Sequence, residues 1–275
     1  MPVTIQSLAS GSAGNTLLVR SPQMTLLIDC GLAPRELHAM LTAADCSPAN
    51  IDVVLITHEH GDHARGLPLL LKNGCPVVAT AGTARALGIP SGLLVHAMPD
   101  RELSFGPLSC LPIAVSHDAA EPCGFNIRID GAHCTVLTDL GMPAHRHSET
   151  LAASDLILIE ANHDVGMLRA GPYSSRLKAR VASSRGHLSN AACAGWLAES
   201  LRGASHAPDI WLAHLSQVNN RPRIATGTVM SALNDRGVEA QVHALPRRGI
   251  GPSWHSGKRK VGHVIRPLQL PLSFA

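Results

Sequence analysis

The segment at residues 57–63 constrains the fold of this chain more than any other feature. It reads THEHGDH and directly follows the apolar run 53–56, which predicts a buried strand ending in a polar turn. Its metal-ligating side chains are His58, His60, Asp62 and His63. Imidazole and carboxylate groups are common metal ligands, and a turn held at the end of a strand can direct several of them at one point. The segment therefore predicts a metal site delivered by a strand.

The composition is that of a folded chain. A hydrophobic content of 45% over 275 residues excludes a disordered chain and fits one large domain or two small ones. Lys and Arg number 23 against 20 Asp and Glu, and the resulting net charge of +3 is too small to identify a nucleic-acid or membrane partner. The 16 histidines outnumber Phe, Trp and Tyr together, which favours a chemical role for some of them.

Cysteine usage and the N-terminus bear on the cellular location. The seven cysteines stand singly without a CxxC pair, which favours neither a disulfide framework nor a thiolate zinc site. Residues 1–6 show no signal-peptide pattern, and no run of about 18 apolar residues occurs. We therefore expect a cytoplasmic protein without a membrane partner.

Short apolar runs alternate with helical stretches along the chain. The runs that predict strands are 3–8, 16–19, 25–28, 53–57, 76–79, 108–115, 124–129, 133–137, 156–159, 210–213 and 239–245. The stretches that predict helices are 34–44, 62–72, 190–201 and 228–234. Strands mixed with helices in both halves indicate a layered α/β architecture.

Two segments are polar and basic. Residues 162–185 predict an irregular stretch that carries several arginines and lysines. After Glu239 the chain has no acidic residue but six arginines and lysines. We expect residues 1–246 to form the domain and residues 247–275 to be an exposed basic extension.

The motif HxHxDH at 58–63, with LLIDCG at 26–31, resembles the metallo-β-lactamase-fold hydrolases. The resemblance implies a four-layer αββα sandwich that holds one or two metal ions at the sheet edges. Further residues of the pattern stand where predicted strands end, as loops at strand ends often carry functional groups. They are His117 after VS at 115–116, Asp139 at the end of VLTD and His214 at the end of IWLAH.

Several shorter motifs narrow the resemblance to the YycJ/WalJ-type branch. They are SGSAGN at 10–15, SHDAA at 116–120, EANHD at 160–164, RAGPY at 169–173, RGHLSN at 185–190 and AHLS at 213–216 with Asn219 and Asn220. The resemblance, which spans about residues 3–245, implies a cytoplasmic metal-dependent hydrolase with 5′-exonuclease activity on DNA. The basic tail and Cys30 depart from the pattern without touching an implied ligand.

The resemblance implies two divalent ions. His58, His60 and His117 would hold one, Asp62, His63 and His214 the other, and Asp139 would bridge them. Ligands without a thiolate suit Zn²⁺, Mn²⁺ or Fe²⁺. For Asp62 and His63 a supporting role in the turn stays open. Asp29 would orient a ligand histidine rather than bind metal.

The resemblance also implies catalytic and substrate-binding groups. His187 would contact the scissile phosphate or protonate the leaving oxygen. Asp62 and Asp139, which would bind the ions, are the other predicted catalytic residues. The alternative for His187 is a loop histidine without a catalytic role. The predicted substrate contacts are Asn15, Asn162, His163, Arg169, Lys178, Ser189 and Asn219. Ser189 would also cap a helix. For the asparagines and His163, an equally good alternative is that their side chains stabilise turns. For Arg169 and Lys178, the alternative to phosphate binding is a solvated position on the surface.

Three functions compete at this point. The first is a two-metal phosphodiesterase, a 5′-exonuclease on DNA with RNA as a further substrate, in which hydroxide attacks phosphorus. The second is a small-molecule metallo-hydrolase, namely a lactonase, thioesterase or cyclic phosphodiester hydrolase, since a fold does not fix its substrate. The third is a non-catalytic, metal-stabilised DNA-binding module. The complete set of implied metal ligands argues against this third function. The scarcity of aromatic residues favours backbone contact over base recognition.

Overall fold

The apolar runs of the N-terminal half form a seven-stranded mixed sheet. In the computed structural model, which describes residues 2–257, its strand order is β14-β1-β2-β3-β4-β5-β6. The strands are β1 (Thr4–Ala9), β2 (Thr16–Arg20), β3 (Thr25–Ile28), β4 (Val53–Leu55), β5 (Val77–Ala79), β6 (Leu94–His96) and β14 (Ser253–His255). Strands β3 to β6 run parallel, so their carboxyl ends meet at one edge of the sheet.

The second sheet also has seven strands, in the order β13-β12-β11-β10-β9-β8-β7. They are β7 (Leu103–Phe105), β8 (Leu108–Ala114), β9 (Cys123–Ile129), β10 (Ala132–Leu137), β11 (Leu156–Glu160), β12 (Asp209–Ala213) and β13 (Val242–Ala244). Strands β10 to β13 run parallel, which again gathers carboxyl ends at one edge.

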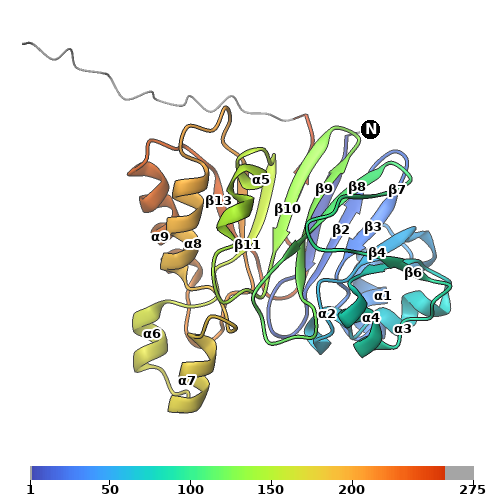
Figure 1. The fold of residues 1–275 in the computed structure, drawn as a ribbon, viewed down its shortest axis with the longest axis horizontal. Helices are drawn as coiled ribbons and strands as arrows, with labels where there is room; N and C mark the ends of the chain where they lie inside the picture. Colours follow the sequence, from blue (N-terminus) through green and yellow to red (C-terminus); the bar gives the residue numbers. More distant parts are fainter. Residues whose placement is uncertain (1, 258–275) are drawn as a thin grey trace, which may run out of the picture.

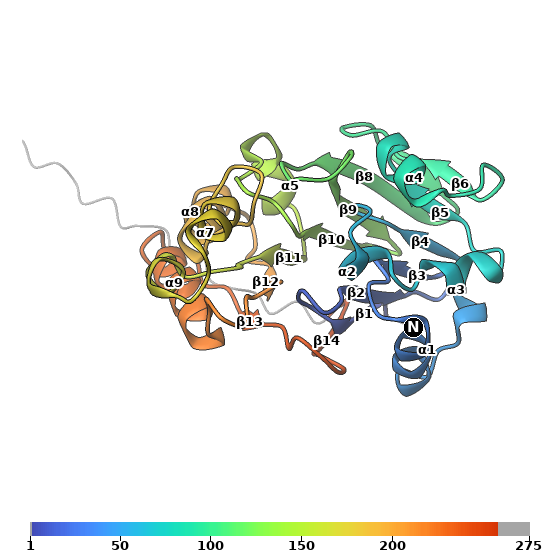
Figure 2. The same cartoon turned by 90° about the horizontal axis from the view of Figure 1, so that it is seen from below.

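Helices cover the outer face of each sheet (Figures 1 and 2). They are α1 (Pro34–Ala43), α2 (Gly61–Ala64), α3 (Leu67–Lys72), α4 (Ala81–Leu87), α5 (Ser148–Ala152), α6 (Val165–Ala170), α7 (Ser175–Val181), α8 (Asn190–Ser200) and α9 (Pro222–Asn234), with 3₁₀ turns at Pro48–Asn50 and His145–His147. Among the described residues, no helix is long and apolar enough to cross a membrane.

Three apolar clusters separate the layers. Alternate residues of β2 point to opposite faces of its sheet, so Val19 joins the cluster between the two sheets while Leu18 packs under α1 and α3. A third cluster, which contains Trp196 and Ile159, lies between the second sheet and its helices. This order of helices, sheet, sheet and helices confirms the predicted αββα sandwich.

Several predicted elements differ in the structure. The helix expected at 228–234 begins at Pro222, and the strand expected at 239–245 is limited to Val242–Ala244. The helix expected at 62–72 is divided into α2 and α3 at Gly66, whose backbone nitrogen donates to the Cys30 carbonyl at 2.7 Å. A Cβ at Gly66 would lie 2.8 Å from that oxygen, so this close approach requires glycine. The segment 162–185, expected to be irregular, contains α6 and α7, which Asp164 and Ser174 cap through their side chains.

The expected boundary at residue 246 is also corrected. Strand β14 pairs with β1, with Ser253 opposite Gln6 and His255 opposite Thr4. The first part of the predicted exposed extension is therefore an edge strand of the first sheet. The rest of the predicted extension, residues 258–275, lies outside the described residues.

Candidate metal centre

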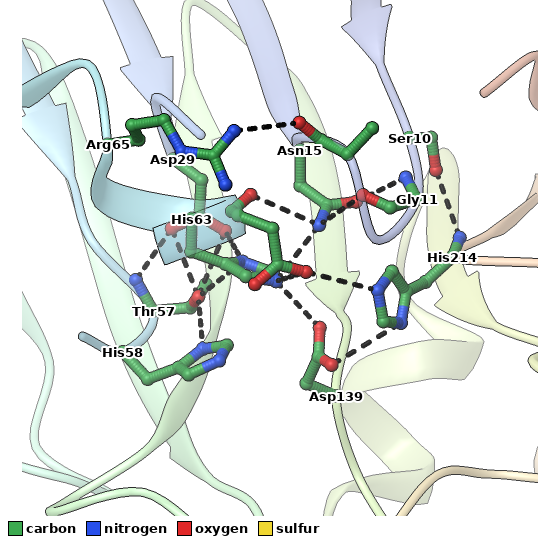
Figure 3. Close-up of polar contacts among 12 residues, drawn as sticks. Ser10, Gly11, Asn15, Asp29, Thr57, His58, His63, Arg65, Asp139 and His214 are labelled. Atoms are coloured by element: carbon green, nitrogen blue, oxygen red, sulfur yellow. Dashed lines mark hydrogen bonds and ion pairs between the residues drawn. The ribbon is translucent and has the colours of Figure 1, made fainter. Parts of the chain in front are cut away.

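The candidate ligands collect where the carboxyl edges of both sheets meet (Figure 3). The 57–63 loop follows β4, and α2 begins inside it, so that Asp62 and His63 stand in its first turn. Asp139 follows β10, and His214 follows β12 directly. Both have left-handed backbone, with φ of 53°, and Asp29 after β3 has a φ of 59°. This conformation turns the chain sharply at the point where each side chain enters the centre.

The structure brings all seven predicted ligands together. One group consists of His58, His60 and His117, and a second of Asp62, His63 and His214; within each group the potential ligand atoms lie within 4.8 Å of one another. Asp139 forms a third such group with His58 and His63, one from each set. The geometry thus permits two neighbouring cation sites with Asp139 between them.

Asp29 lies behind His63, where it can orient that ring. Its Oδ2 is 2.7 Å from His63 Nδ1, and both side chains are buried. A carboxylate that accepts the Nδ1 proton leaves Nε2 to face the ligand cluster. Asp29 thus contacts a candidate ligand histidine, and its role in orienting a metal-bound ring stays a prediction.

Thr57 is a site residue that sequence reasoning missed. Its Oγ1 donates to the Asp29 carboxylate at 2.9 Å and lies 3.0 Å from His58 Nδ1, which can donate to it. One buried hydroxyl therefore connects histidines of both groups through Asp29. The only signal in the sequence was its position immediately before the first histidine of the motif.

Glu160 is the second residue that was missed. It closes β11 at the same sheet edge and is fully buried. Its Oε1 lies 2.8 Å from His214 Nδ1 and 2.9 Å from His187 Nδ1. Its Oε2 accepts the backbone N–H groups of Leu140 and Leu188, each at 3.0 Å. One carboxylate thus orients a candidate ligand and the candidate acid, and its place at a strand end was the available signal.

Opposite charges stabilise the buried groups. Burial raises the pKa of the Asp139 carboxyl, but His214 and His63 outweigh it and hold this pKa well below its usual range. Burial lowers the pKa of His63, whereas Asp29 and Asp139 raise it, to about 10. Burial raises the pKa of Glu160, but His187 lowers it more, to about 2. Because an imidazole must be neutral to bind a cation, metal binding here releases protons.

The residues fit divalent metal ions. His58 is 1% exposed, and its Nε2 has no hydrogen-bond partner in the part of the chain that the structure describes. A buried ring nitrogen without a partner costs folding free energy unless its lone pair binds a hydrogen-bond donor or a metal ion. The donor set of imidazoles and carboxylates, without a thiolate, suits borderline cations. His58, with His60 and His117 beside it, therefore has the chemistry of a metal ligand.

His187 lies at the solvent side of the centre. Its side chain is 24% exposed, and its Nδ1 is 3.4 Å from Asp139 Oδ1. Burial lowers the pKa of His187, but the neighbouring Glu160 carboxylate outweighs it and raises this pKa. The predicted acid is thus adjacent to the ligands, partly exposed and inclined to carry a proton.

Three of the predicted substrate contacts are buried, and two of them contact candidate ligands. Asn15 accepts the Gly11 N–H through Oδ1 at 2.9 Å, and its Nδ2 lies 2.9 Å from His63 Nε2. Asn162 donates to the backbone carbonyl of His214 at 2.8 Å. Asn219 is fully buried, and its backbone carbonyl accepts the N–H of Asp164. Both amide atoms of the Asn219 side chain are without a hydrogen-bond partner among the described residues, and contact of these three residues with substrate stays a prediction.

The remaining predicted contacts have different environments. Ser189 caps α8 by accepting the Ala192 N–H at 3.2 Å, and His163 beside it is 3% exposed. Arg169 and Lys178 belong to the protruding helices α6 and α7 (Figure 1). Lys178 donates to the Arg169 carbonyl at 2.7 Å, which joins the two helices.

Comparison with known proteins identifies the family. A model described as "Beta-lactamase superfamily domain" matches residues 24–210. The chain belongs to this superfamily. Like its relatives in this superfamily, it is a metal-dependent hydrolase with the metallo-β-lactamase fold.

Within the superfamily, the chain belongs to the branch of WalJ and YycJ. Exodeoxyribonuclease WalJ of Streptococcus pneumoniae is 35% identical over 234 residues, which are 82% of this chain and 86% of the relative. Exodeoxyribonuclease YycJ of Bacillus anthracis is 33% identical over 237 residues, with coverages of 84% and 89%. The crystal structure of YhfI from Bacillus subtilis superposes with a TM-score of 0.68 at 17% identity, covering 92% of this chain and 99% of YhfI, which supports the fold.

Proposed function

We propose that this chain is a two-metal phosphodiesterase that acts as an exonuclease on nucleic acid, with DNA degraded from the 5′ end. The observation that carries the proposal is the convergence of two ligand groups on Asp139 in one buried cluster. The relatives named as exodeoxyribonucleases, which match most of the chain, support the substrate class. A cytoplasmic location is part of the proposal, and the seven free cysteines are in keeping with a reducing compartment.

We assign the ligands in two sets. His58, His60 and His117 would hold one ion, Asp62, His63 and His214 would hold the second, and Asp139 lies between the two sets. The ions, Zn²⁺, Mn²⁺ or Fe²⁺, would supply Lewis acidity toward phosphate oxygens and would lower the pKa of bound water. Thr57 and Asp29 fix the rings of His58 and His63, so that each presents Nε2 to the cluster.

His187 assists departure of the leaving oxygen. Glu160 accepts the proton on His187 Nδ1, and this leaves Nε2 as the atom that can hold and release a second proton. The raised pKa keeps the ring charged to a higher pH than an ordinary histidine. A charged imidazole beside the scissile phosphate also neutralises the developing negative charge.

A panel of divalent ions on labelled oligonucleotides tests this function. Metal-free protein is loaded with each ion and given strands that carry either a 5′ or a 3′ phosphate. We expect ion-dependent release of mononucleotides from the 5′ end. His60→Ala and Asp139→Ala are each expected to abolish release, whereas His38→Ala, an exposed histidine on α1, is the matched control and retains it.

Folding of each variant is checked by circular dichroism. Turnover at the wild-type rate by both ligand variants would refute the ligand assignment. Hydrolysis of lactones or thioesters without any cleavage of oligonucleotides would favour the small-molecule alternative.

A further inference from the structure

Helices α6 and α7 form a basic projection beside the metal centre, here called the α6–α7 arm (residues 165–185). From residue 165 to residue 198 the chain contains no Asp or Glu. The arm carries five cations, namely Arg169, Arg176, Lys178, Arg180 and Arg185. In Figure 1 both helices project beyond α8 and α9. An excess of positive over negative charge creates a local field that attracts anions.

The base of the arm is fastened to the loop that carries His117. Arg180 binds Asp118 Oδ2 through Nε at 2.9 Å and a terminal nitrogen at 2.7 Å. Arg185 reaches the His117 carbonyl at 3.4 Å, and the Gly186 carbonyl lies 3.1 Å from His117 Nδ1. The arm therefore has a fixed position relative to the metal centre.

The other cations of the arm are available to a ligand. Arg169 and Arg176 are exposed, and neither forms an ion pair with any carboxylate in the described part of the chain. Arg176 stands four residues before Arg180, so the two Cβ atoms lie about 6 Å apart on one face of α7. Arg176 therefore lies on the same face of α7 as Arg180, which binds the Asp118 beside His117. Tyr173, in the connection between the two helices, is half-buried and is the aromatic residue of the arm.

We propose that the α6–α7 arm binds the phosphate backbone of a single nucleic-acid strand whose end occupies the metal centre. This proposal rests on the proposed function and adds the path of the substrate. Arg176 and Arg169 neutralise phosphates beyond the scissile one, and Tyr173 stacks with a base. Cations that follow a backbone, combined with an aromatic platform, are the features that bind single strands irrespective of sequence.

The test compares two double variants. Arg169→Ala/Arg176→Ala removes the free cations of the arm, and Arg35→Ala/Lys72→Ala removes two exposed cations from α1 and α3 as the matched control. With a single-stranded oligonucleotide, we expect KM of the arm variant to rise about 10-fold at constant kcat, with the control unchanged. The salt dependence of log(kcat/KM) should lose about 1.4 in slope, because two phosphate contacts are removed.

A substrate too short to reach the arm separates the two proposals. Hydrolysis of bis(p-nitrophenyl) phosphate should be equal in the wild type and in the arm variant. The binding of a fluorescent oligonucleotide to metal-free protein, followed by anisotropy, tests the arm even if no turnover occurs. Equal Kd values and equal salt slopes for the arm variant and the control would overturn the proposal that the arm binds nucleic acid. An absence of hydrolysis by the wild-type protein would overturn the proposed function alone.

Discussion

At the residue scale, substitution of Thr57 tests whether its hydroxyl connects the two groups of ligands. Thr57→Val keeps the shape of the side chain but leaves His58 Nδ1 and Asp29 without their shared hydroxyl. We expect metal affinity to fall about 10- to 100-fold, the usual cost of removing a group that orients ligands. Isothermal titration of metal-free protein measures it.

Thr57→Ser restores the hydroxyl and is expected to bind metal like the wild type. Equal affinities for the Val and Ser variants would show that the hydroxyl does not position the ligands.

The sequence revealed candidate ligands but not the residues that connect them. His58, His60 and His63 were recognisable because they stand within one short motif. Glu160 and Thr57 act through partners that are brought near by the sheets, since Glu160 contacts His214 54 residues further along. The spacing of residues along the chain does not predict contacts between residues that are distant in sequence. The same limit explains why the burial of Asn162 and Asn219 could not be foreseen.

At the scale of elements, β14 shows how a short edge strand escapes detection. It has three residues, lies in a basic, glycine-containing stretch, and depends on the free edge of β1 for its hydrogen bonds. Helices α6 and α7 were missed for a related reason, because each has seven residues or fewer and too little apolar periodicity. Longer elements, such as β10 and α8, follow from their apolar patterns.

Trp254 links β14 to the cluster between the sheets. Trp254→Ala should lower the free energy of unfolding by about 2 kcal/mol, less than for a fully buried ring because Trp254 is only partly covered. Urea denaturation measures the change. Ser253→Ala, an exposed neighbour in the same strand, should stay within about 0.5 kcal/mol of the wild type. Similar values for the two variants would mean that the ring contributes nothing to the core.

At the scale of the whole molecule, the metal centre joins the two sheets. His58 and His63 follow a strand of the first sheet, while Asp139 and His214 follow strands of the second. A divalent ion bound between them would stabilise the folded state by mass action, by about 4 kcal/mol at a thousand times its Kd. The αββα architecture that creates this seam was predictable by resemblance, whereas the pairing of individual strands was not.

We therefore expect chelation to lower the Tm and a divalent ion to restore it in a concentration-dependent manner. Differential scanning calorimetry at graded ion concentrations measures the shift. Asp139→Ala should lose most of the ion-dependent rise in Tm, because Asp139 lies close to histidines of both ligand groups. An ion-independent Tm in the wild type would contradict a bridging centre.

The left-handed backbone at Asp29, Asp139 and His214 sets a limit on engineering this enzyme. Each such residue costs folding free energy, on the order of 1 kcal/mol or more, that glycine would not incur. Glycine at Asp29 or Asp139 would relieve this backbone cost but would also remove a carboxylate that pairs with His63. Backbone strain and buried ion pairs are thus tied to the same residues, so that stability cannot be gained at these positions by relaxing the backbone alone.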